Sequence, residues 1–276
     1  MTGNEEEMRE AVAALRKAVD LATGNSPHRT QHRATLGSAL CLAAKRLDEP
    51  ALRSEGIALL RTALREPDTL VADHAALLSD LGVALFAEAV ANGGRDWLHE
   101  EGMAACRRAA DTPPNAFARS ACLTNLGLLL AGFAERTGRI DLLDDACATA
   151  REALDGAPAG HPLRARAHFA LSRALDARYT AVSSMSDQDE AVAHARRGAE
   201  SGSADDVPRR VLLATHLAGM LGNRAGNAWD PGGLGVLGTP GDPAEIDAPL
   251  ALLRALAAEV PSRSADRARV LRALGH

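Results

Sequence analysis

Apolar positions return along the chain with a fixed spacing, and the most regular of them is a leucine followed by a glycine. Leu36-Gly37, Leu81-Gly82 and Leu126-Gly127 stand 45 residues apart, and the slot returns in altered form at Leu171-Ser172 and Leu217-Ala218. A fixed period of this length is typical of a helical unit copied several times, in which each copy buries its apolar face against its neighbours. The pattern predicts an elongated helical array, and it names no partner.

Each repeat contains two apolar-periodic segments, which predict an A helix and a B helix. In each A helix a second leucine follows the first by four positions, which puts both on one helix face. Glycine inside a helix costs about 1 kcal/mol relative to alanine, so its recurrence predicts a close approach by a neighbouring helix. The pattern predicts a first B helix at 4–23, A–B pairs at 26–66, 68–111, 112–156, 161–202 and 205–260, and a partial sixth unit at 262–276.

An arginine occupies the same position of every predicted B helix. The six residues are Arg16, Arg61, Arg107, Arg151, Arg196 and Arg254. Aligned guanidinium groups would suit an anion-binding stripe. A residue fixed in every copy is better explained by a role that every copy shares, so we interpret the six as a structural ladder. In that ladder the arginine stem packs and its head bonds to the adjacent unit.

Two segments interrupt the repeat. The loop 226–242, rich in glycine and proline, separates the two helices of the fifth pair, and we interpret it as an insertion, with a binding element as the alternative. Residues 267–275 superimpose on 119–127, so the sequence stops inside a sixth A helix. This stub is either a capping helix or the start of a unit that continues in a longer protein. The second interpretation is favoured, because a cap would depart from the repeat pattern.

Composition supports an all-α class and narrows the kinds of partner. Hydrophobic residues, chiefly alanine and leucine, make up 46% of the chain and aromatic residues only 3%, which suits packed helices better than a sheet. The net charge of -5 and the lack of a basic tract argue against a nucleic-acid partner. The lack of a long apolar run and the acidic start argue against a membrane span and a secretory signal. We therefore expect a cytoplasmic protein.

The repeat resembles a known family. Its L-G-x-x-L core is similar to the L-G-x-x-Y core of tetratricopeptide repeats, and residues 119–154, with N-L-G, E-R-T-G, D-L-L-D-D-A and A-R-E-A-L, look like the long-repeat tetratricopeptide arrays of actinobacteria. The linker 158–165 resembles their inter-repeat turn. The period differs from the usual 34 residues, and its length alone also suits HEAT or armadillo repeats.

The resemblance implies a single domain over 1–276, a right-handed α-solenoid of about five to six two-helix repeats. It also implies a concave groove, lined mainly by A helices, that binds a protein or peptide. Such arrays often precede a CHAT domain, a caspase-like protease module, so it further implies an effector domain that follows the array. We expect no cofactor and no enzymatic activity in this chain.

Residues that recognise a partner should vary from copy to copy. The position just before each A-helix leucine is polar and non-repeating, and it predicts Asp80, Asn125 and His216 as groove residues. A merely solvated helix face is the alternative. The prediction is a scaffold that docks a helix or an extended peptide.

Four other groups of residues resemble catalytic, metal-binding or nucleotide-binding sites, and each also has a simpler explanation. The acids Asp141, Asp144 and Asp145 suit a magnesium-diphosphate site and hence a small all-α enzyme, but they open a B helix, where acids favour the helix dipole. Ser120-Ala121-Cys122 is similar to the tripeptide around the CHAT catalytic cysteine, yet it lies in core register without a base. His28 and His32 stand one turn apart without a third ligand. Gly232-Gly-Leu-Gly235 lacks the strand and helix of a nucleotide site.

Overall fold

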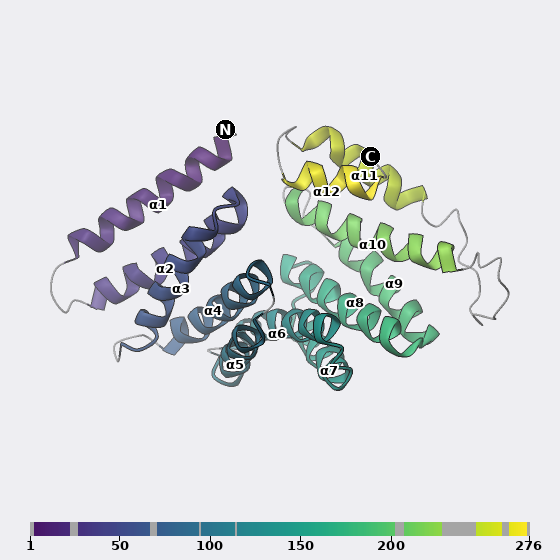
Figure 1. The fold of residues 1–276 in the computed structure, drawn as a ribbon, viewed down its shortest axis with the longest axis horizontal. Coiled ribbons are helices and arrows are strands. Elements are labelled where there is room, and N and C mark those ends of the chain that lie inside the picture. Colours follow the sequence, from purple (N-terminus) through teal and green to yellow (C-terminus); the bar gives the residue numbers. More distant parts are fainter. Residues whose placement is uncertain are drawn as a thin grey trace. The chain divides into compact units, whose positions relative to one another are not determined.

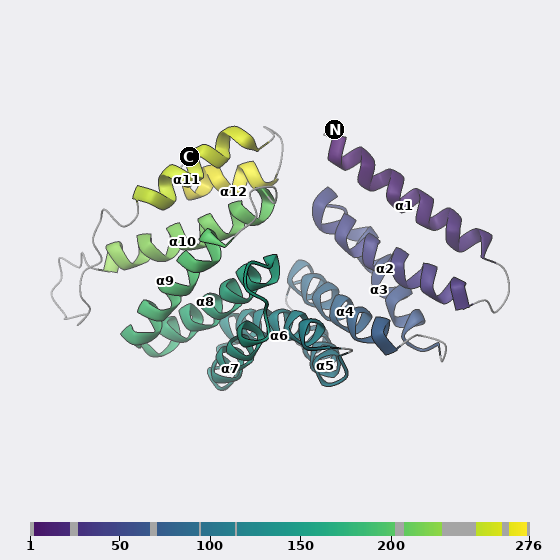
Figure 2. The same ribbon diagram turned by 180° about the vertical axis from the view of Figure 1, so that it is seen from behind.

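A computed structural model describes residues 3–22, 27–66, 71–93, 95–113, 115–201, 207–227, 247–260 and 265–274. Over these ranges the chain forms helices throughout and no strand, so the fold is all-α, as Figures 1 and 2 show from opposite sides. The predicted loop 226–242 begins with two helical residues, and the rest of it, including Gly232-Gly235, lies outside the described residues.

Helices of the two predicted types alternate along the chain. The B helices are α1 (Gly3–Leu21), α3 (Pro50–Ala63), α5 (Asp96–Asp111), α7 (Asp141–Asp155), α9 (Met185–Glu200) and α11 (Asp247–Glu259). The A helices are α2 (Pro27–Leu47), α4 (Val71–Ala91), α6 (Ala116–Thr137), α8 (Pro162–Val182), α10 (Val207–Asn227) and α12 (Ala265–Ala273).

The chain divides into two compact units, Met1–Phe133 and Ala134–His276, with the boundary inside α6. In the N-terminal unit each helix from α1 to α5 contacts the next one, and α2 also contacts α4. In the C-terminal unit the same holds from α7 to α12, and α10 also contacts α12. Packing in both units is therefore dominated by helices that are neighbours in sequence.

The Leu-Gly slot marks the place where the two helices of a pair come closest. A Cβ atom added at Gly37 of α2 would lie 3.2 Å from the carbonyl oxygen of Gly56 in α3. One added at Gly82 of α4 would lie 2.7 Å from the carbonyl oxygen of Gly102 in α5. The second contact leaves no room for a side chain and the first would need the neighbouring helix to shift slightly, which confirms the predicted close approach for both pairs. The B helix carries a glycine at the same contact, so each backbone meets the other directly.

Two A helices are long and apolar enough to cross a membrane by length and composition alone. These are His74–Ala91 within α4 and the whole of α6, each with charged residues inside it. The structure buries 50% and 56% of them, which is how helices in a protein core behave. They are weak evidence for a membrane span.

Candidate functional site

Two of the three predicted groove residues belong to the N-terminal unit, and both lie where successive A helices meet. Asp80 of α4 is exposed, and its carboxylate accepts a hydrogen bond of 2.5 Å from the Ser38 hydroxyl of α2. Asn125 of α6 is half-buried, and its side-chain amide donates to the Ser79 hydroxyl of α4 at 2.9 Å. Each residue therefore helps to join two A helices, and Asp80 also faces solvent.

The third predicted groove residue, His216 of α10, is enclosed in the C-terminal unit. The Ser172 hydroxyl of α8 donates to the Ala191 carbonyl at 2.9 Å, so it accepts the hydrogen bond from His216 Nε2, also at 2.9 Å. The ring packs edge-on against Phe169 with centroids 5.1 Å apart. Burial lowers the pKa of His216 to about 3, so the ring is neutral at physiological pH. This histidine is well placed to hold α10 on α8 and poorly placed to meet a partner.

Large apolar side chains are exposed around Asp80. Val83 and Val90 follow Asp80 on the same side of α4, and their exposed fractions are 41% and 57%. The Ser38–Asp80 hydrogen bond joins this side to α2, where Leu42, one turn after Ser38, is 47% exposed. We call Leu42, Asp80, Val83 and Val90 the A-helix face of the N-terminal unit. It combines apolar surface with one carboxylate.

Three ladder arginines donate to a glutamate on the next B helix. The pairs are Arg16–Glu55 at 2.6 Å, Arg61–Glu101 at 2.6 Å and Arg151–Glu190 at 3.0 Å. Arg107, Arg196 and Arg254 occupy the same position on α5, α9 and α11. The paired side chains are one-third to one-half exposed, so each pair contributes at most about 1 kcal/mol.

The acidic partners of the ladder arginines also recur at a fixed position of the B helices. The sequence-based prediction missed this repeat. An acid stands six residues before the ladder arginine in five of the six B helices: Glu10, Glu55, Glu101, Asp145 and Glu190. This spacing was readable from the chain, because the acid is missing only from α11, where Ala248 takes its place. It gives Asp145 the same repeat position as the pairing glutamates.

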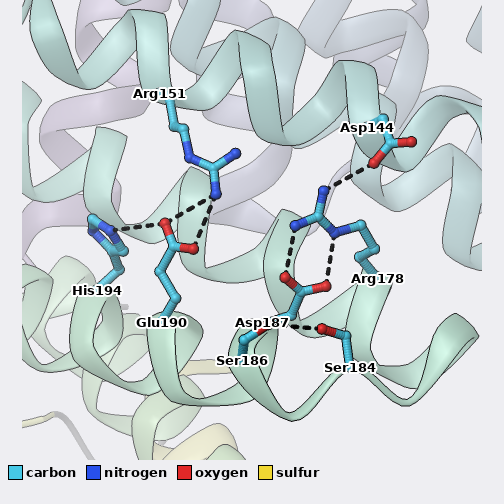
Figure 3. Close-up of polar contacts among 8 residues, drawn as sticks. All are labelled: Asp144, Arg151, Arg178, Ser184, Ser186, Asp187, Glu190 and His194. Carbon is cyan, nitrogen blue, oxygen red and sulfur yellow. Dashed lines mark hydrogen bonds and ion pairs between the residues drawn. The ribbon is translucent and has the colours of Figure 1, made fainter.

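The other two acids of the candidate magnesium site each pair with a different arginine. Asp141 accepts two hydrogen bonds from Arg139, at 2.6 and 2.8 Å, and these lower its pKa. Asp144 accepts one from Arg178 of α8 at 2.9 Å (Figure 3). Within the described residues, no group of three or more His, Cys, Asp or Glu side chains is placed to hold a metal ion. Asp141 thus makes a local contact at the start of α7, and Asp144 makes one that joins α7 to α8.

Arg178 links three helices of the C-terminal unit. Besides Asp144 on α7, it donates from Nε at 2.8 Å and from Nη2 at 2.6 Å to both carboxylate oxygens of Asp187, at the start of α9 (Figure 3). Asp187 is only 6% exposed, and the hydrogen bonds from Arg178 lower its pKa. Nearby, Arg151 donates to both carboxylate oxygens of Glu190 at 3.0 Å, and His194 Nε2 lies 3.8 Å from one of them (Figure 3). The network ties consecutive helices together and leaves Asp187 buried in charged form.

Two imidazoles share a hydrogen bond beside this network. Nδ1 of His168 lies 2.8 Å from Nδ1 of His194, and both rings are buried. One ring nitrogen must donate and the other accept, so both rings cannot be protonated at these atoms together. Burial first, and the charge of His194 second, lower the pKa of His168 to about 4. The pair is therefore neutral at physiological pH.

The remaining candidates are the cysteine of Ser120-Ala121-Cys122 and the histidine pair His28 and His32. Cys122 is a buried free thiol of α6, and burial raises its pKa, which is the opposite of what a nucleophile needs. Burial also raises the pKa of Cys106 to about 12. His32 is half-buried on α2, and the side chain of His28 lies outside the described part of the chain.

Comparison of the chain with models of known protein families finds no match, and comparison with curated proteins finds none either. The resemblance to tetratricopeptide arrays therefore rests on the short motifs in the sequence.

Proposed function

We propose that this chain is a tetratricopeptide-like, right-handed α-solenoid that acts as a non-enzymatic scaffold and binds a protein or peptide segment on the A-helix face. The alternation of A and B helices and the contacts between sequence neighbours support the solenoid. The observation that carries the binding function is the exposure of Leu42, Val83 and Val90 around the Asp80 carboxylate. Exposed apolar groups that gather on one face are typical of interaction sites.

The chemistry of the face defines the partner. Apolar side chains of the partner pack on Leu42, Val83 and Val90, and a basic or other donor group next to them bonds to Asp80. An amphipathic helix or an extended peptide supplies such a pattern. Asn125 supports the face indirectly, since it holds α6 on α4, whereas His216 holds α10 on α8 within the C-terminal unit. The composition of the chain supports the cytoplasm as its location, which we include in the proposal. The resemblance supports an effector beyond the array, such as a CHAT-type protease domain, and we include it too.

Selection from a random peptide library displayed on phage tests the proposal without a known partner. We expect selected peptides to share apolar residues and a basic residue, and to bind the whole chain with an affinity measurable by calorimetry. Val83→Glu and Asp80→Lys should each weaken that binding about tenfold, as substitutions at the centre of an interface do.

Ala104→Glu provides the matched control, because Ala104 is an exposed position of the B helix α5. It introduces the same glutamate into a helix and should leave the affinity unchanged. Peptides that bind Val83→Glu and Asp80→Lys as tightly as the unmodified chain would exclude the A-helix face as the site. A library that yields no binder would count against a peptide-binding scaffold altogether.

A further inference from the structure

A cleft of about 480 Å³ lies in the N-terminal unit, between α1 and the turn that joins α2 to α3. Its volume falls within the range of about 300–1,000 Å³ that is usual for small-molecule sites. None of the residues of the A-helix face lines it. The cleft is therefore a surface separate from the one proposed to bind a peptide.

The floor of the cleft is apolar. Val12 of α1 belongs to a core cluster, and Leu47 and Leu52 pack against that cluster while they remain half-buried. The equivalents of Leu52 in α5 and α7 are Leu98 and Leu142, which are only 4% and 9% exposed. Apolar surface that those two helices bury is thus open to a ligand at the start of α3.

Two ion pairs between α1 and α3 stand on either side of this floor. Arg9 donates to Glu49 at 2.8 Å, and Arg16 donates to Glu55 at 2.6 Å. Leu52 lies one helical turn from each glutamate, so it is bracketed by the two pairs. Because both pairs join the same two helices, the walls of the cleft are already in place without a ligand.

Donors for an anion stand at one end of the cleft. Arg16 donates to Glu55 from Nη2 alone, so within the described part of the chain the hydrogens on its Nε and Nη1 are not used. Lys17 is exposed and forms no ion pair with any residue that the structure describes. The cleft has three cations and two anions, Asp20 and Glu49, and Arg9 already occupies Glu49. This balance favours an anionic ligand over a cationic one.

Two of these cations are specific to α1. At the position of Arg9 the other B helices carry acidic or hydroxyl side chains: Ser54, Glu100, Asp144, Asp189 and Asp247. Lys17 is one of only two lysines in the chain, and the other is Lys45. The packing that all copies share does not require a cation at either position. Residues that depart from the repeat are the ones expected to recognise a ligand.

We propose that this cleft binds a small amphipathic carboxylate, a free acid with an unbranched alkyl chain. The carboxylate accepts hydrogen bonds from Lys17 and Arg16, and the alkyl chain lies on Val12, Leu47 and Leu52. Burial of the chain drives binding, and the charge of the head group determines selectivity.

Calorimetric titration of the whole chain with octanoate tests the proposal. We expect saturable binding of one octanoate per chain. Octylammonium has the same alkyl chain and the opposite charge, and it should bind at least about tenfold more weakly. Lys17→Glu should weaken octanoate binding about tenfold. Lys45→Glu is the matched control, because Lys45 is exposed on α2 and does not line the cleft, so octanoate should bind it normally.

The two lysines also provide a direct reporter of the site. Reductive methylation with ¹³C-formaldehyde keeps their charge and gives each ammonium group its own NMR signal, which Lys45→Arg assigns. Octanoate should shift the signal of Lys17 and leave that of Lys45 in place.

Two alanine variants test the place of the alkyl chain. Ala13 lines the cleft from an exposed position, so Ala13→Phe should fill the cleft and abolish binding without disturbing the core. Ala14→Phe is the control, since Ala14 is also exposed but does not line the cleft, and it should bind octanoate normally.

The absence of saturable octanoate binding overturns the proposal. Binding that Lys17→Glu and Ala13→Phe leave unchanged overturns it too, because the ligand then lies elsewhere. Equal affinity for octylammonium excludes recognition of the carboxylate. Val83→Glu should leave octanoate binding unchanged; loss of binding in that variant would place octanoate on the A-helix face and exclude the cleft.

Discussion

Arg178 and Asp187 form a two-pronged ion pair, with Nε and Nη2 of the arginine at 2.8 and 2.6 Å from the two carboxylate oxygens. The pair spans the turn from α8 to α9, and the Asp144 contact extends it to α7. A buried carboxylate is stable as an ion only when such donors replace its water. Removal of one partner is therefore far more damaging than loss of an exposed ion pair.

Arg178→Met should lower the free energy of unfolding by about 3 kcal/mol, because the buried Asp187 carboxylate then loses its charged partner and both of the hydrogen bonds from it. Arg178→Lys should lose less, since one charged donor remains but the fork is lost. Asp144→Ala is the matched control: it removes only the exposed end of the network and should cost about 0.5 kcal/mol. Urea denaturation of the three variants measures the differences. Equal losses for Arg178→Met and Asp144→Ala would contradict the importance of the buried pair.

Gly82→Ala should destabilise the chain by about 2 kcal/mol, because its Cβ would press on the Gly102 carbonyl at 2.7 Å and on the Cys106 sulfur. Gly219→Ala provides the opposite case, since no atom lies within 4 Å of a Cβ built there, in the middle of α10. That variant should gain up to about 1 kcal/mol from helix propensity alone. Thermal unfolding of both variants checks the sign. A stabilised Gly82→Ala would refute the close approach of α4 and α5.

The contrast between these glycines shows why much of the fold was predictable. A close helix contact favours glycine, and Gly37 and Gly82 mark it directly, although two later copies carry Ser172 and Ala218 at that position. The apolar period then gives the alternation of A and B helices. The six-residue spacing from acid to arginine belongs to the same class of signal, as Glu55 and Arg61 show.

The contacts of the variable residues could not be predicted in the same way. A polar residue that differs in every copy faces either a partner or a hydroxyl of the neighbouring helix, and the choice depends on how the helices cross. Ser38 and Ser79 stand at different positions of their repeats, so no period reveals that they bond to Asp80 and Asn125. The Arg178–Asp187 pair occurs in one copy only, and a single occurrence carries no repeat signal.

The four cysteines should be slow to react with a thiol reagent at pH 8 in the folded chain. Burial raises the pKa to about 12 for Cys41 and Cys106 and to about 11 for Cys147, and it raises that of Cys122 as well, so little thiolate is present. After denaturation all four should react rapidly. Ellman titration with and without guanidinium measures both rates. Rapid reaction of one thiol in the folded chain would reopen the interpretation of Ser120-Ala121-Cys122 as a nucleophile.

Stability should decrease on the acid side of pH 6.5, and the buried histidines account for the direction. In the unfolded chain they take up protons with a pKa near 6.5, whereas folding lowers the pKa of His168 to about 4 and that of His216 to about 3. Between these values the unfolded state binds more protons than the folded state, so the free energy of unfolding falls as pH falls. The contribution of His216 alone at pH 4 is on the order of 3 kcal/mol. His216→Gln keeps a donor for Ser172 but does not titrate, so urea denaturation at pH 7, 5.5 and 4 should show a shallower decline for that variant. Parallel declines in the two proteins would mean that His216 takes up its proton in the folded state as readily as in the unfolded one.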